Sequence, residues 1–132
     1  MSDYRTIEVS RADAVGRLAF DRPDAHNALN ERMSEELVDA VHDLVSDDAV
    51  RAIAVTGNGP VFNTGADLTM LSGDGSDEPR LRSLAGNLHE FVGQLVLAPK
   101  PVVTGPEMSS NASASSRWTV VDRRNVSTER PP

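Results

Sequence analysis

The chain has 132 residues, with 13 basic against 20 acidic side chains, a net charge of −7 and no cysteine. This length suits one domain or a part of one. The lack of cysteine excludes disulfides, thiolate metal sites and cysteine nucleophiles, and the negative charge disfavours a nucleic-acid partner. The histidines have no mutual metal-ligand spacing, so we expect no metal site. No apolar run reaches the length of a membrane span, and the N-terminus carries no secretory signal pattern. We therefore expect no membrane association and a cytoplasmic location.

The composition changes after residue 105. Residues 1–105 hold 9 basic and 17 acidic side chains, whereas residues 106–132 hold 4 and 3. All 16 leucine, isoleucine and phenylalanine residues lie in the first segment. Because such residues supply most of a hydrophobic core, we predict a folded unit at 1–105 and a disordered tail at 106–132.

The chain begins with a predicted pair of strands. Apolar and polar residues alternate over residues 4–9 and again over 14–21, which is typical of a hairpin. Pro23 follows the second run and ends it, because proline has no backbone donor. We therefore expect two short antiparallel strands before the first helix.

Helices and strands then alternate. Asn30 is a suitable N-cap for a helix that runs to Ser46 with apolar residues at helical spacing. Residues 51–56 predict a buried parallel strand covered on both faces, and residues 66–71 predict a short helix. A second long helix carries apolar residues from Leu81 to Leu95, and a further buried strand follows at 102–104. This alternation builds a layered α/β fold with right-handed crossovers.

The segment 61–71 (VFNTGADLTML) is the most informative for chemistry. A buried strand runs into a glycine loop, and the first N–H groups of a helix lack internal partners. Gly65 has no Cβ, so a ligand oxygen can approach closely and bind the N–H of Ala66. The alternative is that Gly65 only permits a turn and that Asp67 only caps a helix.

Five motifs in order along the chain carry a resemblance. They are residues 18–23 (LAFDRP), 26–30 (HNALN), 36–40 (ELVDA), 50–57 (VRAIAVTG) and 62–68 (FNTGADL). This succession resembles the N-terminal half of the enoyl-CoA hydratase/isomerase (crotonase) family over residues 5–105. The resemblance implies an α/β, crotonase-like (ClpP/crotonase) ββα spiral that is truncated after its first half.

The resemblance also implies a substrate and a site. Proteins of this family bind an acyl-CoA thioester and stabilise an enolate-like oxygen with two backbone N–H groups, the first of which is here Ala66. The residues expected to line the substrate and CoA channel are Ala25, His26, Ala28, Gly65, Ala66, Asp67, Leu68, Thr69 and Met70, with Leu71 bordering the acyl pocket. Coenzyme A enters as part of the substrate, so no separate cofactor is expected. Asn63 and Thr64 stand where the family often has Ala or Ser.

The family pattern stops at Gly105. The family continues with a glycine-rich segment that supplies the second N–H donor, with catalytic carboxylates, and with helices that build trimers and hexamers. Residues 106–132 contain no glycine, and none of their carboxylates stands in a family-like setting. We therefore expect an acyl-CoA-binding chain of low or no activity. The alternative is a non-catalytic remnant or interaction module that pairs with full-length crotonase paralogues.

Overall fold

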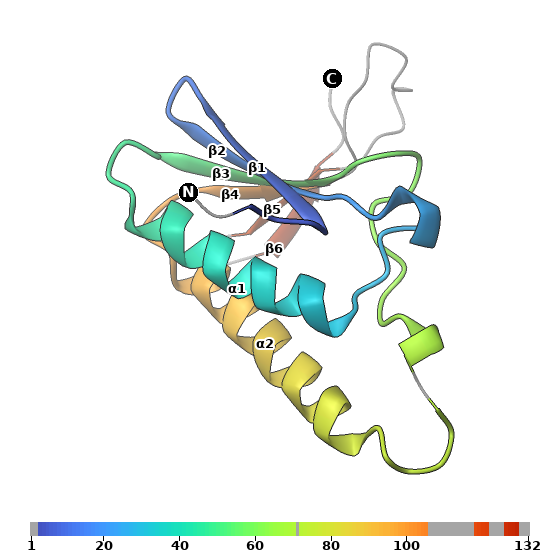
Figure 1. Ribbon diagram of the computed structural model, residues 1–132. Coiled ribbons are helices and arrows are strands. Elements are labelled where there is room, and N and C mark those ends of the chain that lie inside the picture. Colours follow the sequence, from blue (N-terminus) through green and yellow to red (C-terminus); the bar gives the residue numbers. More distant parts are fainter. Residues whose placement is uncertain (1–2, 71, 106–117, 122–125, 130–132) are drawn as a thin grey trace.

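The computed structural model describes residues 3–70, 72–105, 118–121 and 126–129. Its strands, α-helices and 3₁₀ turns (η) follow one another along the chain as Figure 1 shows. In order they are β1 (Ile7–Ala12), β2 (Val15–Phe20), η1 (Pro23–Ala25), α1 (Glu31–Ser46), β3 (Ala52–Gly57), η2 (Leu68–Met70), α2 (Glu78–Leu97), β4 (Val102–Thr104), β5 (Trp118–Val121) and β6 (Val126–Glu129).

The strands form one mixed sheet in the order β1-β2-β3-β4-β5-β6. β1 and β2 pair antiparallel, whereas β3 runs parallel to both β2 and β4. β5 and β6 continue the sheet with antiparallel pairing. Both long helices lie on the same face of this sheet (Figure 1). The carboxyl ends of β2, β3 and β4 therefore meet at one edge, where open α/β sheets hold their ligands.

A single buried cluster joins the sheet to the helices. Leu18 of β2 pairs in register with Val55 of β3, and both belong to this cluster with Leu37 and Leu44 of α1. α2 adds Phe91 and Leu95, and the two helices also pack against each other. Neither helix of the described chain combines the length and the apolar character needed to cross a bilayer. The core thus lies between the sheet and one layer of helices.

Polar groups fix both ends of α1. At its start, the side chain of Asn30 accepts a hydrogen bond from the backbone N–H of Met33 at 2.8 Å, which confirms the predicted cap. At its end, Nζ of Lys100 donates to the carbonyl oxygens of Leu44 and Asp47 at 2.8 and 2.7 Å. A cation at this position satisfies carbonyls that lack helical partners and complements the helix dipole.

Two details of the predicted elements are wrong. β3 is parallel to its neighbours as predicted, but both helices cover the same face, so Ala52 and Ala54 on the other face are only half-buried. The short helix predicted at 66–71 is the three-residue turn η2. Ala66 is not part of that turn, because it forms an isolated parallel bridge with Leu29 instead.

Two described strands lie within the last 27 residues, the segment for which we predicted a disordered tail. Within that segment the structure has β5 and β6, and β5 pairs with β4 from Val102↔Val121 to Thr104↔Thr119. The run WTVV consists of residues that favour strands, and the edge of β4 offers unpaired backbone groups. The lack of leucine, isoleucine and phenylalanine therefore did not prevent strand formation there.

We expect Gly57→Ala to lower the free energy of unfolding by about 1–3 kcal/mol, because a Cβ at Gly57 would stand 2.5 Å from the carbonyl oxygen of Phe62 and 2.9 Å from its Cα. Gly86→Ala is the matched control. Position 86 lies inside α2 with nothing within 4 Å of the added Cβ, so this change is expected to stabilise by roughly 0.5–1 kcal/mol. Urea unfolding measures both, and equal stabilities would contradict the close approach.

Candidate functional site

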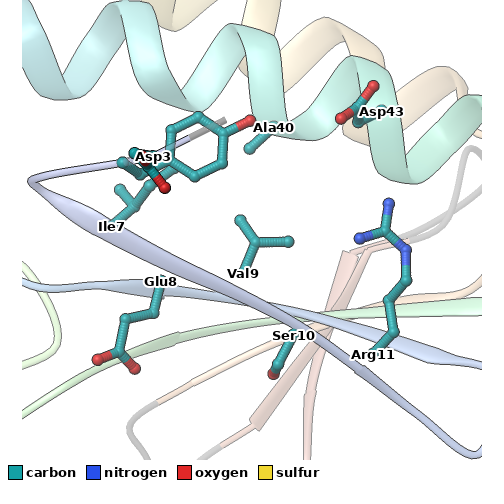
Figure 2. Close-up of a pocket in the computed structure, with 9 residues that line it drawn as sticks. Asp3, Ile7, Glu8, Val9, Ser10, Arg11, Ala40 and Asp43 are labelled. Atoms are coloured by element: carbon teal, nitrogen blue, oxygen red, sulfur yellow. The ribbon is translucent and has the colours of Figure 1, made fainter. Parts of the chain in front are cut away.

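One groove in the structure lies apart from every predicted site residue. It has a volume of about 640 Å³ and opens between β1 and α1 (Figure 2). Its lining residues are Asp3, Tyr4, Ile7, Glu8, Val9, Ser10, Arg11, Ala40 and Asp43. The predicted site lies instead beyond the carboxyl ends of β2 and β3, where the segments that follow these strands come together.

The bridge between Leu29 and Ala66 joins these two segments. The N–H of Leu29 donates to the carbonyl of Gly65 at 2.7 Å, and the N–H of Asp67 donates to the carbonyl of Leu29 at 2.8 Å. In a parallel bridge of this kind, one residue, here Leu29, makes both hydrogen bonds to the neighbours of the other, and the N–H of that other residue, here Ala66, points away from the partner segment. The N–H of Ala66 therefore points outward. Ala66 is exposed, and this N–H donates no hydrogen bond within the part of the chain that the structure describes.

Gly65 needs to be glycine for conformational reasons. Its φ is +94°, which is in the region that residues with a side chain rarely adopt. Its N–H donates to Oδ1 of Asn63 at 2.8 Å, so the turn is held by a side chain two residues earlier. Gly65 directly precedes Ala66, and its carbonyl accepts one of the two hydrogen bonds of the bridge. This conformation agrees with the alternative stated above, in which Gly65 permits a turn.

Asn27 lies at the centre of the site and was not among the predicted site residues. Its side chain is completely buried. Oδ1 accepts a hydrogen bond from the backbone N–H of Arg22 at 2.7 Å, and Nδ2 donates to the carbonyl oxygens of Asn58 and Val61 at 2.9 and 2.7 Å. One amide group therefore ties the turn after β2 to the loop after β3. The sequence feature that could have identified Asn27 is its place in a tight turn after Pro23. Asn tolerates the left-handed φ of +57° that it adopts in this turn.

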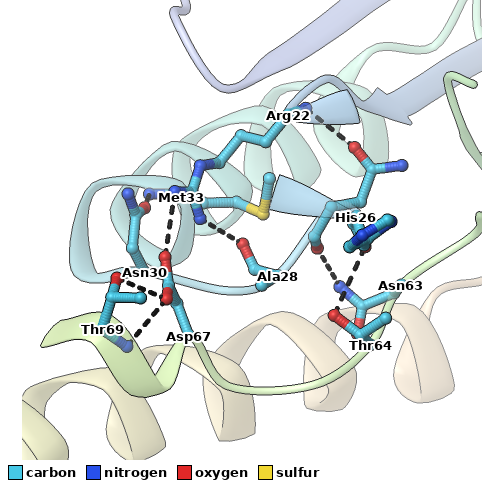
Figure 3. Close-up of polar contacts among 10 residues, drawn as sticks. Arg22, His26, Ala28, Asn30, Met33, Asn63, Thr64, Asp67 and Thr69 are labelled. Atoms are coloured by element: carbon cyan, nitrogen blue, oxygen red, sulfur yellow. Dashed lines mark hydrogen bonds and ion pairs between the residues drawn. The ribbon is translucent and has the colours of Figure 1, made fainter. Parts of the chain in front are cut away.

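Asn63 and Thr64 add two further links between the segments. Nδ2 of Asn63 donates to the carbonyl of Asn27, and Oγ1 of Thr64 donates to the carbonyl of His26 at 3.4 Å (Figure 3). At these two positions, the family that the motifs resemble often has Ala or Ser. Their polar side chains hold the glycine loop against the turn that contains His26.

Arg22 and Asp67 form an ion pair beneath the bridge. Nη2 of Arg22 lies 3.0 Å from Oδ2 of Asp67, and Nη1 donates to the carbonyl of Ala28 (Figure 3). The side chains are only 20% and 11% exposed. Oδ1 of Asp67 accepts from the N–H and the hydroxyl of Thr69 at 3.0 and 2.7 Å. Asp67 thus caps the η2 turn, as the simpler interpretation of the sequence predicted.

These contacts decide the charge of Asp67. Hydrogen bonds from the hydroxyl and the N–H of Thr69, followed by the one from Arg22, lower the pKa of the Asp67 carboxyl below its ordinary value of 3.8. The group is therefore an anion at neutral pH, with both oxygens engaged. It is unsuited to exchanging a proton with a substrate.

The structure brings most of the predicted site residues to this one edge. Ala28, Gly65, Ala66 and Asp67 surround the bridge, and Ala25 and His26 form the adjacent turn. Ala28 is buried and His26 is exposed. Leu68 and Thr69 are exposed in η2, Leu68 to 73%. Met70 ends η2, and Leu71 lies outside the described residues.

We expect Asn27→Gly to lower the free energy of unfolding by about 2–4 kcal/mol, because it removes the three hydrogen bonds that the buried Asn27 side chain makes with backbone groups. Glycine keeps the left-handed backbone, so the change isolates the side chain. The matched control is His26→Gly at the neighbouring left-handed position (φ +54°), which is exposed and is expected to be neutral or stabilising by about 1 kcal/mol. Equal effects of the two variants in urea unfolding would contradict the role given to Asn27.

Asp67 also predicts a pH dependence. Its pKa is lower in the folded than in the unfolded chain, so its contribution to stability is present above pH 3.8 and is lost as the pH falls through the lower, folded value. The stability difference between the wild type and Asp67→Asn is therefore expected to be constant from pH 7 to 5 and to shrink below pH 3.8. Urea unfolding at several pH values measures it, and a difference that grows in acid would contradict this sign.

Comparison with known proteins places the chain. The enoyl-CoA hydratase/isomerase family model matches residues 10–105. Human enoyl-CoA delta isomerase 2 is 34% identical over 108 residues, covering 78% of this chain and 27% of that protein. A 4-chlorobenzoyl coenzyme A dehalogenase of an Arthrobacter species is 34% identical over 119 residues, covering 86% of this chain and 43% of that protein. The chain thus spans less than half the length of these relatives.

Solved structures agree. An enoyl-CoA hydratase from Mycobacterium smegmatis has a TM-score of 0.68 at 29% identity, covering 76% of this chain and 39% of that chain. An enoyl-CoA hydratase/isomerase (crotonase) from Legionella pneumophila has a TM-score of 0.68 at 28% identity, covering 75% and 39%. The resemblance drawn from the motifs is confirmed: the chain has the crotonase fold over the part that it shares, and it belongs to the enoyl-CoA hydratase/isomerase family.

Proposed function

We infer that the chain binds an acyl-CoA thioester at the edge beyond β2 and β3, with the thioester carbonyl oxygen accepting a hydrogen bond from the N–H of Ala66. One observation carries this proposal. Ala66 is exposed and its N–H has no partner among the described residues, yet the bridge to Leu29 holds the residues on both sides of it. A backbone donor that is fixed before the ligand arrives needs no reorganisation to polarise a carbonyl.

The names of the relatives support a thioester as the shared ligand class. They include an enoyl-CoA delta isomerase, a 4-chlorobenzoyl coenzyme A dehalogenase and a trans-2-decenoyl-[acyl-carrier-protein] isomerase. These names differ in reaction and acyl group but share a carbonyl joined to a thiol carrier. Polarisation of that carbonyl is therefore the activity that we propose, without assigning one of these reactions to the chain.

The surroundings of the donor suit the rest of such a ligand. Leu68, two residues after the donor, is 73% exposed, and an apolar side chain at this position offers a contact for an acyl or pantetheine chain. Ala25, His26 and Ala28 lie along the neighbouring turn, where we place the CoA portion. Thr69 and Met70 complete the proposed lining.

We further infer that the chain turns over little substrate. Hydration and isomerisation need a group that exchanges a proton with the substrate, and Asp67, the carboxylate of this site, is held by Thr69 and Arg22. Gly105, where the family pattern stops, supplies no second donor, because its N–H donates to the carbonyl of Val55 at 3.1 Å. Among the described residues, Ala66 is therefore the donor on which the proposed binding depends.

The proposal is tested with two ligands that differ in one oxygen. Butyryl-CoA has the thioester carbonyl, whereas S-butyl-CoA has a methylene group in its place. We expect butyryl-CoA to bind about threefold to tenfold more tightly, which corresponds to one N–H···O hydrogen bond. Calorimetry measures the affinities, and the amide proton signal of Ala66 should shift with butyryl-CoA only.

Gly65→Pro is the companion variant. Proline cannot adopt the φ of +94° found at this position, so the variant is expected to lose the preference for butyryl-CoA. Should this variant fail to fold, the amide spectrum of the wild type decides. Equal affinities for the two ligands would refute the proposed function. An Ala66 amide proton shift that is the same with butyryl-CoA and S-butyl-CoA would refute it as well.

A further inference from the structure

We propose that Arg22 is a positioning residue for the Ala66 N–H, acting by clamping the two segments that flank this amide. The inference rests on the proposed function, since it concerns the same donor. Arg22 does not reach the carbonyl of the ligand in this scheme. Its role is to fix the direction in which Ala66 presents its hydrogen.

The bridge alone holds the amide with few bonds. It consists of two neutral hydrogen bonds, which join Leu29 to Gly65 and to Asp67. Each bond of this kind contributes little net stability in contact with water, and Ala66 itself is exposed. An isolated bridge therefore needs further support if the direction of its N–H is to be constant.

Arg22 supplies that support from both sides of the bridge. Nη1 binds the carbonyl of Ala28, the residue before Leu29, and Nη2 binds Oδ2 of Asp67, the residue after Ala66. The two nitrogens belong to one planar guanidinium, so they fix the distance between these acceptors. Both bonds involve a charged group, which makes them stronger than the neutral bonds of the bridge.

Both partners of the clamp are themselves held. The N–H of Arg22 donates to Oδ1 of the fully buried Asn27 at 2.7 Å, and its carbonyl accepts from Ala25 and Asn27 at 2.9 Å each. On the other side, Asp67 is fixed by Thr69. With 20% and 11% of their side chains exposed, Arg22 and Asp67 have little room to adopt other rotamers. The clamp is therefore formed before any ligand binds.

Lysine cannot replace this arrangement. An ammonium group is a single point of charge, whereas the two acceptors here require two nitrogens in a fixed plane. Arg22→Lys keeps the charge and much of the length but releases either Ala28 or Asp67. The affinity ratio of S-butyl-CoA to butyryl-CoA (the dissociation constant of the first over that of the second) reports the carbonyl contact alone. A residue with a purely structural role would weaken both ligands equally and leave this ratio unchanged.

In the wild type, the ratio is expected to be about 3–10, and in Arg22→Lys it is expected to fall to about 1. Arg82→Lys is the matched control, because Arg82 is 79% exposed and pairs only with Glu78 on α2 in the described contacts. This variant should retain the wild-type ratio. Asp67→Asn, which keeps an oxygen for Thr69 but loses the ion pair, is expected to lower the ratio as Arg22→Lys does.

The outcomes separate this inference from the proposed function. A wild-type ratio of 1 would refute the proposed function itself. A wild-type ratio above 1 that persists in Arg22→Lys would overturn the role of Arg22 while leaving the donor in place. If Arg22→Lys does not fold, the ratio of Asp67→Asn decides between the same two results.

Discussion

The site depends on the parallel bridge between Leu29 and Ala66. This contact brings the segment after β2 to the segment after β3. It uses the carbonyl of Gly65 and the N–H of Asp67, on either side of Ala66, and leaves the N–H of Ala66 pointing outward. A helix starting at Ala66 would have pointed several N–H groups in one direction. The bridge instead leaves a single N–H group, that of Ala66, pointing outward. The chemistry proposed here therefore derives from extended backbone, and the helix dipole contributes little to it.

The sheet and the helices make that bridge possible. Because β2 and β3 are parallel neighbours, their carboxyl ends reach the same edge with Phe20 beside Gly57. Gly57 lets Phe62 approach closely, and the ring of Phe62 packs edge-on against Phe20 with centroids 5.3 Å apart. The loop after β3 is thus anchored to the core just before it turns at Gly65. Packing therefore fixes where the segments after β2 and β3 begin, and hydrogen bonds between the two segments fix how they lie against each other.

Local sequence patterns predicted the elements well and the contacts of the site poorly. The cap at Asn30 and the helical spacing up to Ser46 are properties of neighbouring residues, so α1 could be read directly. The bonds of Asn27 to Asn58 and Val61 join residues more than 30 positions apart. Such a pairing cannot be predicted from the spacing of apolar residues along the chain. β5 was missed for the same reason, since it forms against the edge of β4 and lies outside the leucine-rich part of the chain. Family motifs located the loop at Gly65, but not the groups that orient it.

The contacts that orient the Ala66 amide all arise between residues 22 and 69. Arg22 and Asn27 supply the clamp and the buried link, and Asn63, Asp67 and Thr69 complete the set. The relatives are more than twice as long as the region of this chain that they match, yet none of these contacts requires that additional length. Orientation of the first donor and supply of a proton carrier are therefore separable tasks. In the proposed scheme, the described part of this chain carries the first of these tasks, and Asp67 serves it as a structural anion.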